Sequence, residues 1–197
     1  MEIKKILFDE TKNWNAFRGG DRHSFSLIYE KYFSGLYNYG SKFNHDKEFV
    51  EDCIQDLFVK LWQNRDNINE TPSVKNYLYK SLRNTIYSRL NKVENLDIDN
   101  DSINELDFNL EISPEAYMIE NEHAQQMKSK LDKALDNLTS RQREAVFLRF
   151  FEELTYEEVA NLMRITVKAL YKIIARALEN LREAFRTLLI LMIVVYF

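Results

Sequence analysis

The sequence predicts an all-α protein of two small helical domains joined by an acidic flexible linker, the second domain carrying a helix-turn-helix. Two observations support this class. The 197 residues include only 4 Gly and 2 Pro, and no glycine follows Gly40. Hairpin turns and glycine-rich phosphate loops therefore have almost no residue suited to positive φ. Apolar residues also recur at spacings of three and four, which is the pattern of amphipathic helices.

Charge divides the chain into three parts. The net charge of −4 is the sum of +2 over residues 1–95, −9 over residues 96–126 and +3 over residues 127–197. The acidic part is rich in Asn and Asp and lacks helical periodicity, so we expect a linker over 93–113. On charge alone it is either a solvated tether or a mimic of nucleic acid that lies in the basic channel of a partner.

The first domain is expected over residues 20–92, after an N-terminal extension of residues 1–19. Two amphipathic stretches run from Phe25 to Phe43 and from Val50 to Trp62. A third helix is expected to start at Thr71, with this threonine as N-cap and the following proline as first helical residue. The many aromatic residues of this domain are interpreted as core.

The second domain is expected over residues 114–187. Thr139 and Thr155 each begin a capping box, with Gln or Glu three residues later, and Thr166 is a further N-cap. The helices that these signals imply run over 114–137, 140–151, 156–163 and 167–187.

The stretch from Thr155 to Arg176 predicts the helix-turn-helix. Ala160 is the small residue expected where the two helices touch. The second helix combines an apolar back with a front of Lys168, Tyr171, Lys172, Ala175 and Arg176. Such a front suits a DNA major groove, and the alternative is a helical hairpin with a solvated basic face. The turn residue, usually glycine, is Arg164, whose left-handed conformation would cost about 1 kcal/mol.

Nothing in the sequence indicates an enzyme, a cofactor or a metal site. His23, His45 and His123 have no partner at metal-ligand spacing. Cys53 is the only cysteine, which indicates a reducing, cytoplasmic location. The N-terminus is charged too early for a secretory signal.

The last ten residues, 188–197, form an apolar tail without a charge. As a helix the tail would cover about 15 Å, half of the hydrocarbon thickness of a bilayer, so it cannot span a membrane. We expect a helical extension buried against the chain's own domains or a partner. Membrane-surface contact and self-association are the alternatives.

Two sets of motifs resemble the sigma factors of bacterial RNA polymerase. The segment from Val50 to Trp62, VEDCIQDLFVKLW, is followed by Tyr77-Leu78 and Arg83-Asn84, as in the promoter-melting domain of that family. LTSRQRE from Leu138 and YEEVA from Tyr156 are similar to its second promoter-binding domain. The two-domain organisation is similar to that of the extracytoplasmic-function (ECF) group.

The resemblance implies a sigma factor that binds core RNA polymerase, directs it to promoters and initiates DNA melting, without chemistry of its own. It also implies an anti-sigma factor as a partner and a path for the acidic linker through the nucleic-acid channel of the polymerase. The rivals are a free-standing helix-turn-helix regulator and a helical adaptor of polymerase that does not bind DNA.

Site residues follow from the same resemblance. Polymerase binding is expected at three residues on the exposed side of the helix over 50–62, namely Asp52, Gln55 and Asp56. Minus-ten recognition and melting are expected at Asn67 and Asn69, in the loop before the third helix, and at Asn76, Lys80, Arg83, Asn84, Tyr87 and Asn91. Minus-thirty-five recognition is expected at Thr166, Lys168, Ala169, Tyr171, Lys172 and Arg176. Tyr77 and Ser88 replace residues common in relatives, tryptophan and aspartate, and leave the base preference open.

Overall fold

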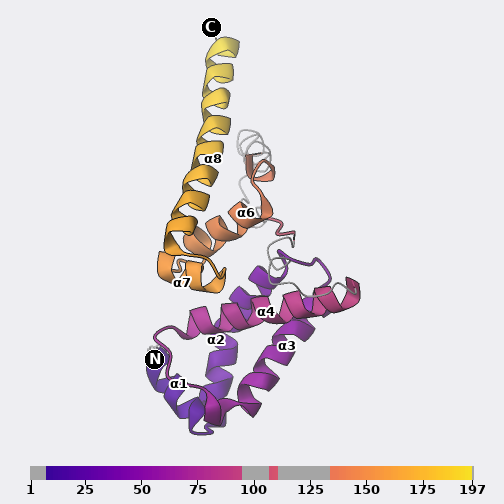
Figure 1. Ribbon diagram of the computed structural model, residues 1–197, viewed down its shortest axis with the longest axis vertical. Coiled ribbons are helices and arrows are strands. Elements are labelled where there is room, and N and C mark those ends of the chain that lie inside the picture. Colours follow the sequence, from indigo (N-terminus) through magenta and orange to yellow (C-terminus); the bar gives the residue numbers. More distant parts are fainter. Residues whose placement is uncertain (1–7, 95–106, 111–133, 197) are drawn as a thin grey trace, which may run out of the picture. The chain divides into compact units, whose positions relative to one another are not determined.

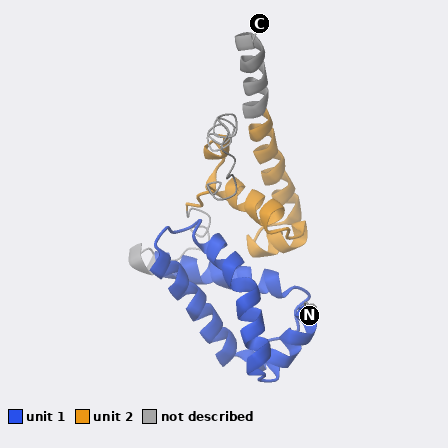
Figure 2. Ribbon diagram, turned by 180° about the vertical axis from the view of Figure 1, so that it is seen from behind, with its two compact units in different colours: residues 1–98 blue, residues 99–197 orange. Residues whose placement is uncertain are grey.

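The structure is a computed structural model that describes residues 8–94, 107–110 and 134–196. The chain divides into two compact units, residues 1–98 and 99–197 (Figure 2). All the regular elements within the described ranges are helical (Figure 1), so the predicted all-α class is confirmed.

Unit 1 is a helical bundle in which α2 contacts α1, α3 and α4. Its elements are α1 (Glu10–Arg18), α2 (Arg22–Gly40), α3 (Lys47–Gln63), the 3-10 turn η1 (Arg65–Asn67) and α4 (Val74–Glu94). Asp9, Asp21 and Asp46 cap the first three helices with their side chains, which accept hydrogen bonds from backbone amides of the first turn.

The start of α4 differs from the expected one. The helix begins at Val74, and the Ser73 hydroxyl accepts a hydrogen bond from the Asn76 amide at 3.2 Å. Thr71 was therefore wrongly assigned as the N-cap. A second acceptor comes from outside the helix, because the Glu10 carboxylate accepts from the amides of Val74 and Lys75 at 2.8 and 3.3 Å. A carboxylate at this end also complements the helix dipole.

The N-terminal extension is the main correction to the predicted first domain. Residues 10–18 form α1, and this helix buries Trp14 and Phe17, which are 2% and 0% exposed. Phe17 packs against Phe25 of α2 and Trp62 of α3, with ring centroids 5.6 and 6.3 Å apart. The helix thus belongs to the core, and the boundary at residue 20 is placed too late.

Unit 2 contains the expected helix-turn-helix. Its elements are α6 (Ser140–Val146), the π-helical segment η4 (Phe147–Phe151), α7 (Tyr156–Leu162) and α8 (Val167–Tyr196). Both predicted capping boxes, at Thr139 and Thr155, are confirmed. The helix expected over 140–151 changes from α to π geometry at Phe147. Most of the helix expected over 114–137 lies outside the described residues.

A short part of the predicted linker packs against unit 2. Phe108 and Leu110 are 1% and 6% exposed, and the ring of Phe108 lies 5.7 Å from that of Phe147. Arg143 Nε donates to the Phe108 carbonyl at 2.7 Å, and Arg143 Nη2 lies 3.2 Å from Asp107 Oδ1. The expectation of a tether throughout 93–113 is therefore wrong for residues 107–110. Two apolar side chains in an acidic segment suffice to anchor it.

The backbone of α8 continues as a helix through the apolar tail to Tyr196. The side chains of the tail lie outside the described part of the chain. No helix within that part has the length and apolar character needed to cross a bilayer.

The turn of the helix-turn-helix has the backbone strain expected from its sequence. Arg164 has a φ of 55°, in the left-handed region. Its amide donates to the Asn161 carbonyl at 3.3 Å, and the amide of Ile165 donates to the Ala160 carbonyl at 2.9 Å. These bonds close α7 in the manner of a C-terminal cap whose preferred residue is glycine.

We predict that Arg164→Gly is about 1 kcal/mol more stable than Arg164→Ala, because both variants lose the side chain and only glycine relieves the strain. Denaturant unfolding of the two variants measures the difference. Equal stability would contradict strain at this turn.

Candidate nucleic-acid and polymerase interface

The DNA-facing residues expected on α8 share one exposed side. Leu170, Ile174 and Ala177 are buried against the rest of unit 2. On the opposite side, Lys168, Tyr171, Lys172 and Arg176 are exposed, Thr166 is exposed at the start, and Ala169 is half-buried. Thr166 is also the N-cap, because its hydroxyl accepts from the Ala169 amide at 3.2 Å. The side presented to solvent is thus basic and carries one aromatic ring.

The ring of Tyr171 is held by an aromatic stack that the sequence alone did not indicate. Tyr171 stacks on Tyr156 of α7, with ring centroids 4.3 Å apart and planes 18° apart. The guanidinium carbon of Arg149 lies 5.2 Å from the centre of the Tyr156 ring, within the range of a cation–π contact. Tyr171 remains 53% exposed. The stack therefore orients Tyr171 while leaving it accessible.

The expected DNA-facing arc of α4 is only partly exposed. Asn84 is exposed, Asn76 and Lys80 are half-buried, and the Asn91 side chain lies outside the described residues. Arg83 and Tyr87 are buried, at 2% and 5% exposure, so their assignment to an exposed surface is wrong.

The reason lies in how Arg83 and Tyr87 pack. Arg83 Nη2 donates to the Tyr87 hydroxyl at 2.9 Å, and its guanidinium carbon lies 4.5 Å from the Tyr87 ring centre. The Tyr87 ring in turn meets Phe43, with centroids 5.9 Å apart. Because α4 packs against both α2 and α3, its buried side is wider than a single apolar stripe.

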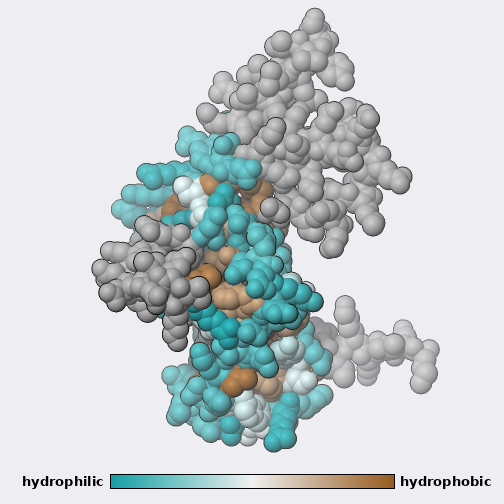
Figure 3. All heavy atoms as spheres, turned by 90° about the vertical axis from the view of Figure 1, so that its right-hand side faces the viewer, coloured by the Kyte–Doolittle hydropathy of each residue, from teal (hydrophilic) through white to brown (hydrophobic). Residues whose placement is uncertain are grey.

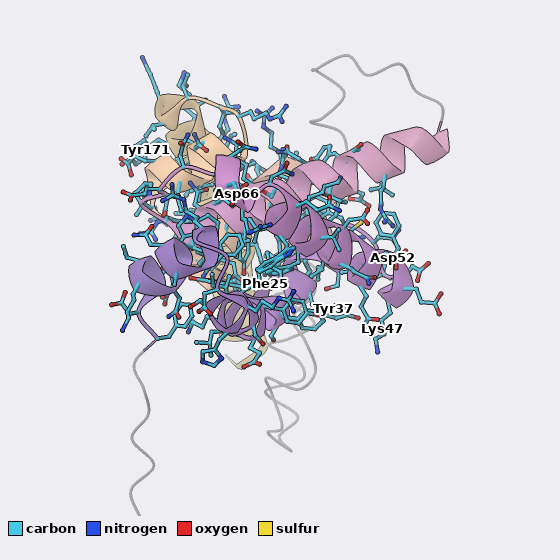
Figure 4. The ribbon with its side chains drawn as sticks, turned by 90° about the horizontal axis from the view of Figure 1, so that it is seen from below. Phe25, Tyr37, Lys47, Asp52, Asp66 and Tyr171 are labelled. Atoms are coloured by element: carbon cyan, nitrogen blue, oxygen red, sulfur yellow. The ribbon has the colours of Figure 1, made fainter. Side chains whose placement is uncertain are left out.

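The loop before α4 exposes the side chains of Asn67 and Asn69. It begins with η1, on which Figure 4 labels Asp66. The Arg65 guanidinium carbon lies 4.8 Å from the centre of a ring of Trp62, so the turn is held against the end of α3. Two amide side chains able to donate and accept are thereby presented to solvent.

A pocket of about 240 Å³ with both apolar and polar lining residues lies between α3 and α4. Its lining residues are Leu57, Lys60, Leu61, Asn64, Tyr77, Ser81, Asn84 and Thr85. Only Asn84 among them was expected to contact DNA. Burial raises the pKa of the Tyr77 hydroxyl. Asn64 directly precedes η1, which brings the pocket to the start of the loop.

The acidic side of α3 is engaged within the chain. Arg89 of α4 lies between two carboxylates, with Nη2 at 2.6 Å from Asp56 Oδ2 and Nη1 at 3.2 Å from Asp52 Oδ2. The bond to Asp56 contributes most to a raised pKa of Arg89. Gln55 is exposed. Asp52 is also exposed, as expected, whereas Asp56 is half-buried, and both aspartates are paired with Arg89 of a neighbouring helix.

An apolar groove of about 670 Å³ opens beside Gln55. Its lining residues are Phe25, Tyr29, Phe33, Glu51, Gln55, Phe58, Val59, Trp62 and Gln63. Figure 4 shows Phe25 among the side chains between the helices and Asp52 at the outer side of α3. Sequence reasoning interpreted these aromatic residues as core. The available signal was the spacing of four between Phe25, Tyr29 and Phe33, which widens the apolar side of α2.

Large apolar side chains are exposed at two places within the described ranges: Tyr29 and Val59 at the groove, and Phe150, Phe151, Tyr171 and Leu178 in unit 2. The face in Figure 3 is mainly hydrophilic, with small hydrophobic areas between. Val59, at the groove, is 47% exposed and Tyr29 is 38% exposed. An apolar groove with exposed side chains at its edge is typical of a protein-binding site.

Comparison with known families accounts for both units. The family described as Sigma-70 region 2 matches residues 28–95, and the one described as Sigma-70, region 4 matches residues 128–181. Relatives include the ECF RNA polymerase sigma factor SigM of Bacillus subtilis, 27% identical over 160 residues (80% of this chain, 93% of SigM). The RNA polymerase sigma-H factor of Pseudomonas aeruginosa is 27% identical over 179 residues (86% of this chain, 90% of that protein).

Solved structures share the fold. The structure of CnrH in complex with the cytosolic domain of CnrY matches with a TM-score of 0.60 and 17% identity, covering 90% of this chain and 97% of that chain. The sigma factor RpoE in complex with the anti-sigma factor NepR, from Bartonella quintana, matches with a TM-score of 0.58 and 23% identity, covering 82% and 96%.

Regions 2 and 4 in this order define a promoter-directing sigma factor of RNA polymerase. Within that class, the chain belongs to the ECF group of the sigma-70 family.

The orientation of α3 generates a prediction about Cys53. This residue is buried and 0% exposed, and burial raises its thiol pKa to about 11. At pH 8 the thiolate fraction is therefore small, and a thiol reagent should label Cys53 only after unfolding. Gln55→Cys, which adds a cysteine on the exposed side of the same helix, should react at once. Rapid labelling of the native unchanged chain would show that α3 is turned differently.

Proposed function

We propose that unit 1 binds core RNA polymerase and opens the minus-ten element, while α8 of unit 2 reads the minus-thirty-five element. The observation that carries the proposal is the division of α8 into a buried apolar side and an exposed side with Lys168, Tyr171, Lys172 and Arg176. Such a helix, preceded by α7 and a tight turn, can lie in a major groove.

The basic side chains of α8 and its tyrosine have different proposed roles. Lys168, Lys172 and Arg176 contact phosphates or guanine edges, because their donors match both. Tyr171, supported by Tyr156, presents an oriented ring and hydroxyl near the middle of the contact. The Thr166 hydroxyl and the helix N-terminus contribute further to phosphate binding.

Polymerase binding is assigned to the groove between α2 and α3 together with the acidic side of α3. The groove offers Phe25, Tyr29, Val59 and Trp62 to an apolar partner surface. The polar residues of its lining are Glu51, Gln55 and Gln63, and Asp52 and Asp56 lie on the same helix α3. An apolar centre with a polar rim is the usual anatomy of a protein interface.

Minus-ten opening is assigned to the loop and the pocket that follow α3. Asn67 and Asn69 can read base edges, and the pocket of about 240 Å³ can take a base extruded from the duplex. Asn64 and Asn84 supply amide groups inside it, and Tyr77 supplies an aromatic ring. Asn76 and Lys80, on the same helix α4 as Asn84, can contact the DNA backbone.

The chain itself carries out no phosphodiester chemistry under this proposal, since that belongs to the polymerase. It works in the bacterial cytoplasm, where polymerase and promoter meet. Because the solved relative RpoE is held by the anti-sigma factor NepR, an anti-sigma factor is also proposed as a partner. The acidic linker is proposed to follow the nucleic-acid channel of the polymerase.

Runoff transcription with reconstituted polymerase on genomic fragments tests the proposal. The double variant Lys168→Ala, Lys172→Ala should lose most promoter-directed transcript, while its affinity for core polymerase stays unchanged. Loss of two phosphate contacts should reduce the salt dependence of promoter binding by about 2 in the slope of log K against log salt.

Arg182→Ala is the matched control, because Arg182 is exposed further along α8 and is not assigned to DNA. It should transcribe like the unchanged chain. A transcript that does not depend on adding the chain would refute the proposed function.

The groove generates a separate prediction. Val59→Asp should weaken binding to core polymerase by about 10-fold or more, because docking would bury an unpaired charge. Val59→Thr keeps the shape without a charge and should bind nearly normally. Equilibrium binding of labelled chain to core polymerase measures both. Equal affinities of Val59→Asp and Val59→Thr for core polymerase would show that the groove is not part of the interface.

A further inference from the structure

We propose that α1 positions the loop that opens the minus-ten element, with Arg18 as the main positioning residue. The inference rests on the role proposed above for Asn67 and Asn69. Helix α1 lies before the matched region 2, which starts at residue 28. No role is therefore assigned to it by the comparisons.

Arg18 makes the shortest contact between α1 and the loop. Its Nε donates to the Ile68 carbonyl at 2.6 Å, and its Nη1 lies 3.6 Å from Glu70 Oε1. The same Nη1 donates to Asn15 Oδ1 at 3.3 Å. The guanidinium is therefore held by its own helix while it binds the loop on either side of Asn69. A charged donor of fixed planar geometry is well suited to such a task.

Two further residues of α1 bind the same stretch of chain. Trp14 Nε1 lies 3.4 Å from the Asn69 carbonyl, which accepts its hydrogen bond, and the Trp14 ring packs edge-on against Tyr77 at 5.3 Å. Glu10 accepts from the amides of Val74 and Lys75. Contacts from one face of α1 thus run from Ile68 to the first turn of α4.

These contacts determine which groups of the loop remain available. The carbonyls of Ile68 and Asn69 are bound to α1, whereas the Asn67 and Asn69 side chains are exposed. Ile68 has extended backbone geometry, with φ −82° and ψ 127°. A loop held in one conformation before DNA arrives needs no ordering at the moment of base capture. Arg18 would then act on melting without touching DNA.

Three variants of the full chain test this, each assembled with core polymerase on a promoter located by the runoff experiment. Arg18→Met removes the donor and keeps a long side chain, and Arg18→Lys keeps a charge and one donor. Arg22→Met is the matched control, because Arg22 is an exposed arginine of α2 for which no contact is seen with other described residues.

The readout is the rate of strand opening, followed by permanganate reactivity of unpaired thymines. Each chain is measured on the duplex promoter and on the same promoter carrying a pre-melted mismatched bubble. We expect Arg18→Met to open the duplex about 10-fold more slowly, as for loss of one charged hydrogen bond, with a much smaller effect on the bubble. Arg18→Lys should recover part of the rate, and Arg22→Met should match the unchanged chain. Core affinity should stay unchanged in all variants, and the thermal midpoint should fall only slightly in Arg18→Met.

Two results would overturn the inference while leaving the proposed function intact. In one, the unchanged chain opens the promoter and Arg18→Met opens it equally fast. In the other, Arg18→Met loses duplex and bubble activity equally, together with core affinity and thermal midpoint, which is the result of a folding defect. Failure of the unchanged chain to open any promoter would instead refute the proposed function, and this inference with it.

Discussion

Contact between three aromatic rings, Phe17, Phe25 and Trp62, is the interaction on which unit 1 depends. Phe25 and Trp62 lie 5.1 Å apart across α2 and α3, and Phe17 adds α1 to the same cluster. Burial of large rings contributes more apolar area per residue than any other side chains. On one side this cluster holds α1, which binds the loop before α4. On the other, Phe25 and Trp62 line the groove assigned to polymerase.

This shared cluster contacts both the groove proposed for docking and the helix α1, which binds the loop proposed for melting. The groove is formed by α2 and α3, and the loop follows α3 directly. Arg89 makes a second connection, because it joins the α4 helix to the carboxylates of Asp52 and Asp56. A partner that binds those carboxylates must share or replace an existing ion pair. We therefore expect the two carboxylates to contribute more to the orientation and selectivity of partner binding than to its affinity.

Local signals predicted the helices well and the exposed surfaces less well. The capping boxes at Thr139 and Thr155 and the left-handed Arg164 depend on residues within one turn, and all three were found as expected. Arg83 and Tyr87 were misassigned because a helical wheel gives the angular position of each residue on its own helix and does not show which other helices pack there. Helices α1, α2 and α3 all contact α4. A guanidinium can be buried when a tyrosine stacks and bonds with it. The aromatic groove was missed because periodicity does not distinguish a core ring from a ring in an open groove.

By itself the sequence determined the all-α class, the helix-turn-helix with its polar side and the family, since these follow from periodicity, capping and motif order. Only the tertiary structure decided the rest: that α1 belongs to the core, that residues 107–110 pack on unit 2, and that the loop carbonyls are bound by Arg18 and Trp14. Those features depend on contacts between residues about 35 to 55 positions apart along the chain. No local pattern encodes such contacts, because each of the two contacting segments, taken alone, has the sequence of an ordinary amphipathic helix or an ordinary loop.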